Sequence, residues 1–121
     1  MDKMIIGTGV DITEVKRLRQ AVEKWGNGFL NRVFTKEELK NAKTRGSLYQ
    51  HLAGRFAAKE AVFKALGDAE LNWKDVQILN DKQGRPCCKI LNNRGKGVEV
   101  HISISHVKNY AVANAIVTEK S

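Results

Sequence analysis

The ten residues Phe56-Ala57-Ala58-Lys59-Glu60-Ala61-Val62-Phe63-Lys64-Ala65 decide how this chain folds. Alanine, valine and phenylalanine surround the charged residues, which predicts a helix that is packed rather than fully solvated. Glu60 and Lys64 are four residues apart, so their side chains lie side by side on one face of that helix. A carboxylate beside a cation in apolar surroundings indicates a site for a metal ion and a phosphate. The alternative is an ordinary surface ion pair, worth a few tenths of a kcal/mol.

The helix that contains this stretch is predicted to be the longest in the chain. Ser47-Leu48-Tyr49-Gln50 matches a capping box that begins the helix, and Gly67 ends it. Arg55 and Lys59 form a second pair four residues apart, and we expect these like charges to face either an anion or solvent. The expected buried positions on this helix are Leu48, Leu52, Phe56, Phe63 and Leu66.

The segment before this helix is predicted to form one strand and two shorter helices. Residues 4–12 are apolar and interrupted by glycines, and we expect the strand to end at Asp11. Thr13 then caps a helix that continues to residue 24 and stops at Gly26. Thr35-Lys36-Glu37-Glu38 matches another capping box and begins a helix that extends to about residue 43.

After Gly67 the apolar residues alternate instead of recurring at helical spacing. This change predicts strands near residues 76–79, 85–91, 98–105 and 110–118. Because the helices come first, we predict an α+β fold in which the long helix packs on an antiparallel sheet, with one domain over residues 1–121. Ala111, Ala113 and Ala115 make one strand face very small, so it receives either the long helix or a neighbouring subunit.

The composition excludes some classes of protein and leaves others open. With 42% hydrophobic residues among 121, the chain is too apolar to be disordered. The formal net charge of +8 favours an acidic partner, and nucleic acid, anionic lipid, acidic protein and phosphorylated small molecules all qualify. Cys87 and Cys88 are adjacent in a predicted strand, which argues against a disulfide between them and fits a cytoplasmic protein. We see no signal-peptide core and no membrane-spanning run, so we expect no membrane partner.

Two acidic residues, Asp11 and Glu60, are candidates for a magnesium site. Magnesium in proteins is usually held by one or two carboxylates together with waters and substrate phosphates. These two carboxylates would share an ion if the first strand packs beside the long helix. Without that arrangement, Asp11 is a turn or capping residue at the end of its strand.

Three further motifs carry weaker signals. His106 follows Ser103-Ile104-Ser105 at a predicted strand end. A Ser–His nucleophile lacks an orienting acid here, so the alternatives are a hydrogen-bond donor or solvated loop residue and, in a chain this basic, a phosphate contact. Gly84-Arg85-Pro86 is a turn that can present an arginine and backbone amides to a phosphate. Gly7-Thr8-Gly9 lacks the third glycine of a dinucleotide fingerprint, and the sequence contains no P-loop.

Four segments taken together resemble one family, the bacterial holo-acyl-carrier-protein synthases, which are short 4′-phosphopantetheinyl transferases. They occur in the family's order and span the whole chain. One departure is Val107, where the family often has a small polar residue. The segments are Gly7-Thr8-Gly9-Val10-Asp11-Ile12, Gly54-Arg55-Phe56-Ala57-Ala58-Lys59-Glu60-Ala61 followed by Lys64-Ala65, Gly84-Arg85-Pro86, and Ser103-Ile104-Ser105-His106 with Tyr110-Ala111.

The resemblance implies a magnesium-dependent reaction of fatty acid biosynthesis. Phosphopantetheine would pass from coenzyme A to a serine of apo acyl carrier protein, releasing adenosine 3′,5′-bisphosphate. By resemblance, Asp11 and Glu60 hold Mg²⁺, Lys64 is catalytic, and the active sites lie between the protomers of a homotrimer. The base that deprotonates the serine stays open between Glu60, Asp11 and a metal-bound water. The implied coenzyme A contacts are Lys64, Arg55, Arg45, Gly84, Arg85, Pro86 and His106.

The first helix carries a basic face, and the resemblance implies that this face binds the acidic carrier protein. Its members are Lys16, Arg17, Arg19 and Lys24. The alternative function is a non-catalytic basic module that binds nucleic acid. This helix is only a modest signal for that function, because aromatic residues are not interleaved on its charged face.

Overall fold

The computed structural model describes residues 3–44 and 47–120. It confirms the α+β class, with the long helix packed on an antiparallel sheet. The elements in chain order are β1 (Ile5–Glu14), α1 (Val15–Trp25), α2 (Asn27–Val33), α3 (Lys36–Lys43), α4 (Leu48–Leu66), η1 (Trp73–Asp75), β2 (Val76–Asn80), β3 (Pro86–Ile90), η2 (Asn93–Gly95), β4 (Val98–His106) and β5 (Tyr110–Glu119).

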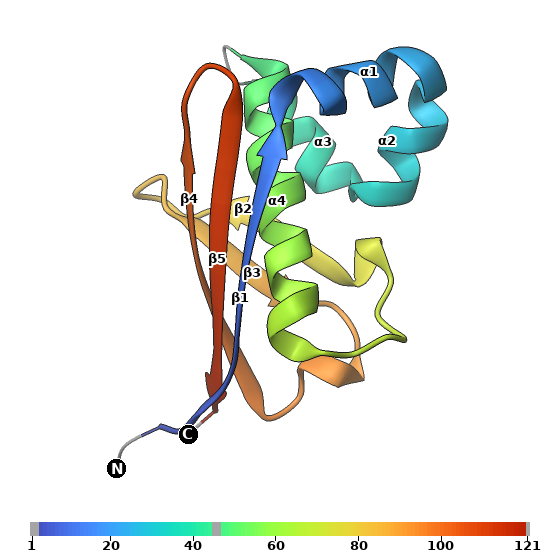
Figure 1. Ribbon diagram of the computed structural model, residues 1–121. Helices are drawn as coiled ribbons and strands as arrows, with labels where there is room; N and C mark the ends of the chain where they lie inside the picture. Colours follow the sequence, from blue (N-terminus) through green and yellow to red (C-terminus); the bar gives the residue numbers. More distant parts are fainter. Residues whose placement is uncertain (1–2, 45–46, 121) are drawn as a thin grey trace.

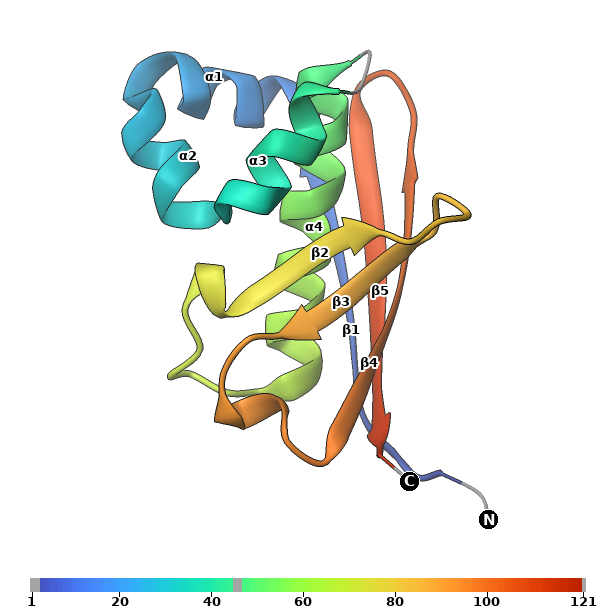
Figure 2. The ribbon, with the colours of Figure 1, turned by 180° about the vertical axis from the view of Figure 1, so that it is seen from behind.

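The main sheet is three-stranded and antiparallel, in the order β1-β5-β4. Helix α4 lies along one face of this sheet, and α1, α2 and α3 gather at one end of α4 (Figure 1). Strands β2 and β3 form a separate hairpin that contacts α4 and β4 (Figure 2). No helix in the described ranges is both long enough and apolar enough to cross a bilayer.

Small side chains allow α4 to approach β5 closely. Ala111, Ala113 and Ala115 are buried, and all three belong to core clusters that also contain alanines of α4. Of the two alternatives for this small face, the long helix is therefore the one that packs on it.

Two glycines on β1 allow an even closer approach to α4. A Cβ added at Gly9 would lie 2.0 Å from the Ala61 carbonyl oxygen, and one added at Gly7 would lie 2.0 Å from that of Ala65. Alternate residues of a strand point to the same face, so Asp11, two residues after Gly9, also faces α4. The glycine spacing thus serves backbone packing, and it brings Asp11 to the helix.

The predictions for the end of β1 were wrong. The strand continues past Asp11 to Glu14, because Asp11 to Glu14 keep pairing with β5 as far as Tyr110. Thr13 lies within the strand and does not cap α1; its hydroxyl donates a hydrogen bond to Asp11 Oδ2 at 3.2 Å. Glu14 is the N-cap residue of α1, and its side chain makes no capping bond.

Other helix boundaries were predicted with mixed success. The capping box at Thr35 and Glu38 is present, whereas Ser47 precedes α4 without a side-chain capping bond. Gly26 ends α1 with φ of 57°, but the chain turns at once into α2, which was not predicted because its glycines were interpreted as a stop. Leu48 was expected to be buried and is 40% exposed, since the core on α4 begins at Leu52.

Candidate functional site

The packing of β1 on α4 brings Asp11 and Glu60 to one cavity. Both residues line a hollow of about 350 Å³ between β1, α1, α2 and α4, together with Thr13, Arg17 and Phe29. The arrangement on which the magnesium hypothesis depends is therefore present: the first strand does pack beside the long helix. Phe29 lies on the unpredicted helix α2, so sequence analysis missed this wall of the cavity.

The electrostatics of the cavity favour a cation. The pKa of Glu60 is raised above its ordinary value, first by burial and then by the negative charge of Asp11, while Lys64 opposes the shift. Two carboxylates that repel each other in this way gain from a shared positive ion. Within residues 3–44 and 47–120, no group of three or more His, Cys, Asp or Glu side chains forms a richer metal site. A two-carboxylate donor set fits magnesium, which takes its remaining ligands from water and phosphate.

Lys64 does not line this cavity but contacts Asp11 from a neighbouring hollow, so its partner differs from the one expected. Its Nζ forms an ion pair with Asp11 Oδ1 at 3.2 Å and donates to the Val10 carbonyl oxygen at 3.0 Å. The predicted helix-surface pair with Glu60 is not the contact that forms. Asp11 is thus held on both oxygens, by Lys64 on Oδ1 and by Thr13 on Oδ2. Thr13 is a site residue that its predicted capping role concealed.

A second cavity of about 350 Å³ collects most of the predicted coenzyme A contacts. Arg55, Gly84, Pro86 and His106 all line it, so α4, the β2–β3 turn and the end of β4 converge there. The guanidinium group of Arg55 donates to the side-chain oxygen of Asn80 in the same cavity. Asp11 and Glu60 do not line this cavity, so one chain carries the two predicted sets in separate hollows.

The other three predicted coenzyme A contacts are Lys64, Arg85 and Arg45. Lys64 does not line this cavity and pairs with Asp11. Arg85 does not line it either; its side chain is 78% exposed and pairs with Asp81 at 3.4 Å. Arg45 lies outside the described residues.

The expectation that Arg55 and Lys59 face an anion or solvent was wrong for Lys59, which is 0% exposed, whereas Arg55 is 6% exposed but lines the second cavity. Their side chains are directed to separate interior partners, Asn80 for Arg55 and Glu38 for Lys59. The repulsion expected from an i, i+4 pair of like charges is therefore offset by partners that lie far away in the sequence.

The basic face of α1 is open to solvent. Lys16, Arg17, Arg19 and Lys24 are all exposed, and Arg17 also lines the cavity of Asp11 and Glu60. Lys24 places its ammonium group 4.9 Å from the ring centre of Trp25. A molecule that bound this face would therefore lie next to the two carboxylates.

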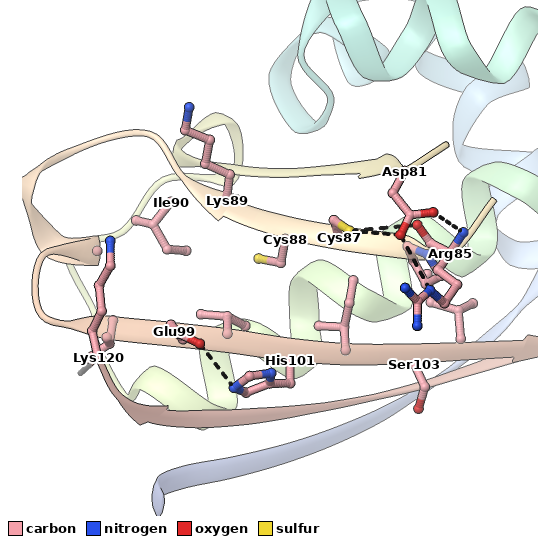
Figure 3. Close-up of a pocket in the computed structure, with 16 residues that line it drawn as sticks. Asp81, Arg85, Cys87, Cys88, Lys89, Ile90, Glu99, His101, Ser103 and Lys120 are labelled. Carbon is pink, nitrogen blue, oxygen red and sulfur yellow. Dashed lines mark hydrogen bonds and ion pairs between the residues drawn. The ribbon is translucent and has the colours of Figure 1, made fainter. Parts of the chain in front are cut away.

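A further hollow of about 740 Å³ lies between β3 and β4, and Asp11 and Glu60 do not line it (Figure 3). Cys88 points into the gap between these strands, whereas Cys87 lies beside Asp81 (Figure 3). Both thiols are free, which confirms the expectation that they form no disulfide. Burial raises the pKa of Cys88 to about 12, so this thiol stays protonated and unreactive at neutral pH.

Comparisons with known proteins agree with this geometry. Residues 7–115 match the model of the 4′-phosphopantetheinyl transferase superfamily. A holo-[acyl-carrier-protein] synthase of Protochlamydia amoebophila is 46% identical over 119 residues, covering 93% of this chain and 98% of that protein. The synthase of Halothermothrix orenii is 42% identical over 118 residues, covering 91% and 94%.

Solved structures show the same fold. The holo-(acyl-carrier-protein) synthase of Bacillus anthracis, crystallised in complex with CoA (3′,5′-ADP), superimposes with a TM-score of 0.84 at 36% identity over 97% of this chain and 99% of that one. The Helicobacter pylori synthase in complex with coenzyme A gives a TM-score of 0.83 at 28% identity over 91% and 98%. With a family match over most of its length and relatives above 40% identity, this chain belongs to the 4′-phosphopantetheinyl transferase superfamily.

Proposed function

We propose that this chain, as one domain over residues 1–121, transfers 4′-phosphopantetheine from coenzyme A to a serine of apo acyl carrier protein and releases adenosine 3′,5′-bisphosphate. The observation that carries the proposal is that Asp11 and Glu60 line one cavity, with Lys64 paired to Asp11. Relatives named holo-[acyl-carrier-protein] synthase support the carrier protein as acceptor, and the complexes of two of them support coenzyme A as donor.

Asp11 and Glu60 would hold Mg²⁺ in this reaction. The ion would supply positive charge to the diphosphate of coenzyme A as its phosphoanhydride bond breaks. The residues fit such an ion because burial and the negative charge of Asp11 both raise the pKa of Glu60, and a bound cation would offset both effects. Lys64, whose side chain is 55% exposed, is free to turn its ammonium group from Asp11 to a bound phosphate.

We infer that the complete site forms between protomers of a homotrimer. Support comes from the two separate cavities, because Arg55 and His106 lie in one and Asp11 and Glu60 in the other. An unusual number of apolar side chains on β1 and β5 are also exposed, among them Val10 (60%), Ile12 (65%) and Val112 (40%). Association through these strands would cover that surface and let one protomer's coenzyme A contacts meet the next protomer's carboxylates. Sedimentation equilibrium tests the trimer, and a monomeric active enzyme would refute it.

The basic face of α1 would bind the carrier protein through electrostatic attraction, which requires an acidic surface on the carrier protein. The four cations Lys16, Arg17, Arg19 and Lys24 are exposed beside the cavity of the acidic pair. Charge complementarity of this kind speeds encounter and sets register. The reaction would serve fatty acid biosynthesis in the cytoplasm.

Mass spectrometry of apo carrier protein, after incubation with the enzyme, coenzyme A and Mg²⁺, tests the function directly. A gain of one phosphopantetheine group per carrier is expected, and its loss on chelation of Mg²⁺ tests the metal. No gain with the unaltered enzyme would refute the transferase. The nucleic-acid alternative predicts salt-dependent binding to duplex or single strands and no response to coenzyme A.

A further inference from the structure

Lys59 is a fully buried cation immediately before Glu60 in the sequence. Its Nζ contacts three acceptors: Glu38 Oε1 at 2.7 Å, the Val33 carbonyl oxygen at 2.7 Å and the Trp73 carbonyl oxygen at 2.9 Å. An ammonium group has three N–H donors, so all of them are used.

Glu38, the partner of Lys59, is equally constrained. Its Oε1 also accepts from the Thr35 backbone N–H at 2.8 Å, and its Oε2 accepts from that of Ile78 at 2.9 Å. The Lys59–Glu38 pair, which we call the buried pair, therefore ties α4 to α2, α3, η1 and β2. A pair this well buried adds little stability over apolar residues of the same size, so a role in setting geometry accounts better for its presence.

The rest of α4 is poorly suited to fix its own rotation. Ten of its residues are buried, and five of these are alanine and one is glycine. Such small side chains permit close packing on β1 and β5 but interlock weakly, so they offer little resistance to turning the helix about its axis. The ion pair of Lys59 and the hydrogen bond of Arg55, one turn earlier, have defined directions and therefore resist rotation of α4 about its axis.

We propose that Lys59 is a positioning residue that, through Glu38, fixes the rotation of α4 and so directs Glu60 toward Asp11. Neighbouring residues of an α-helix are separated by about 100° around its axis. A turn of α4 that shifts Lys59 therefore moves Glu60 by the same angle, away from the carboxylate with which it shares a cavity. The inference rests on the proposed role of Asp11 and Glu60 as metal ligands.

The test removes both charges together, so that neither is left buried alone. The double variant Glu38→Gln with Lys59→Met keeps the volume of both side chains close to the original. We expect it to fold, with a circular dichroism spectrum and a thermal midpoint close to those of the unaltered protein. Mn²⁺ titration followed by electron paramagnetic resonance should give a dissociation constant raised about fivefold or more, and kcat should fall about tenfold or more.

Val117→Ala is the matched control, because Val117 is fully buried on β5 and is not among the hydrogen-bond or ion-pair partners of Lys59 and Glu38. It should lower the thermal midpoint and leave kcat and Mn²⁺ affinity unchanged. The inference is overturned if the double variant binds Mn²⁺ and turns over like the unaltered enzyme, or if Val117→Ala loses both properties equally. If the double variant does not fold, Lys59→Arg replaces it, because arginine keeps the charge beside Glu38 but cannot reproduce the three contacts that Nζ makes, and it is judged by the same two measurements.

Failure of the proposed function would look different. An unaltered enzyme that makes no holo carrier protein contradicts the transferase, whereas the Mn²⁺ comparison between variants still reports on the positioning role.

Discussion

Two lysines of α4, five residues apart, form ion pairs of opposite character. In the buried pair, the side chains of Lys59 and Glu38 are 0% and 1% exposed. In the second pair, which we call the open pair, those of Lys64 and Asp11 are 55% and 17% exposed. The same helix therefore carries one ion pair sealed in the interior and one that reaches solvent.

The two pairs have different roles: the buried pair orients α4, and the open pair can take part in the reaction. Each N–H group of Lys59 Nζ donates to an acceptor in the interior, so Lys59 cannot bind a ligand without losing one of these contacts. Lys64 has a weak, solvated contact that a phosphate can replace. Lys59 and Lys64 both lie among apolar residues in the sequence, so the sequence pattern does not distinguish their roles. The roles differ because the fold brings different partners to each lysine.

The largest expected effect concerns the acidic pair next to Lys64. Glu60→Gln keeps the shape of the side chain and removes the charge, so holo carrier protein formation should fall by at least about 10³-fold while the fold persists. Turnover measured by mass spectrometry and folding measured by circular dichroism check this result. Glu70→Gln is the control, because Glu70 is an exposed acid with no link to the cavity, and it should retain full turnover. Normal turnover in Glu60→Gln would remove the metal assignment.

The two pairs should differ sharply in their contribution to stability. Lys59→Met leaves the carboxylate of Glu38 buried without its cation and should reduce the free energy of unfolding by about 3–5 kcal/mol. Lys64→Met removes an exposed contact and should change it by no more than about 0.5 kcal/mol. Urea unfolding followed by tryptophan fluorescence measures both, because Trp73 packs on Phe56 and Phe63 of α4, whereas Trp25 is already 62% exposed. Equal losses in the two variants would contradict the distinction.

Much of the fold could be predicted from sequence because its signals are local. The capping box at Thr35, the stop at Gly67 and the alternation in β4 each depend on residues that are near one another in the chain. The meeting of Asp11 with Glu60 was also foreseen as a possibility, since both lie in segments with strong signals.

What could not be predicted depends on partners distant in sequence. Lys59 is buried because Glu38 and two backbone carbonyls from other segments reach it, and nothing beside it in the sequence indicates that. Likewise, Thr13 has the right residue type to cap a helix, but pairing with β5 keeps it in the strand. The coenzyme A contacts were identified through family resemblance, and their gathering in one cavity required the fold.

The position of Asp11 in the open pair depends on how closely β1 packs on α4. Gly9→Ala should disturb this packing. The added Cβ would lie 2.0 Å from the Ala61 carbonyl oxygen, so β1 must move away from the helix, at an expected loss of about 1–3 kcal/mol in unfolding free energy. Asp11 would move with the strand, so turnover should fall as well. Gly28→Ala is the control: its Cβ would meet nothing within 4 Å, and the change lies inside α2, where alanine is favoured. Similar losses in both variants would contradict the close-packing explanation.

The smallest expected effect is a pH dependence that belongs to Glu60. Its folded pKa is raised above the ordinary value of 4.5 by burial and by Asp11, so the fold favours the protonated form. The stabilising contribution is therefore full below pH 4.5 and is lost as the pH rises through the folded pKa. Relative to Glu60→Gln, which carries no charge at any pH, the unaltered protein should lose about 1–3 °C of thermal midpoint between pH 4 and pH 7 without metal. Taking the difference between the two proteins cancels the contributions of the other carboxyl groups. Added Mg²⁺ should reduce the difference in thermal midpoint between the two proteins at pH 7, because a bound cation relieves the repulsion that Glu60 experiences. A difference that changes with neither pH nor Mg²⁺ would contradict this account of the cavity.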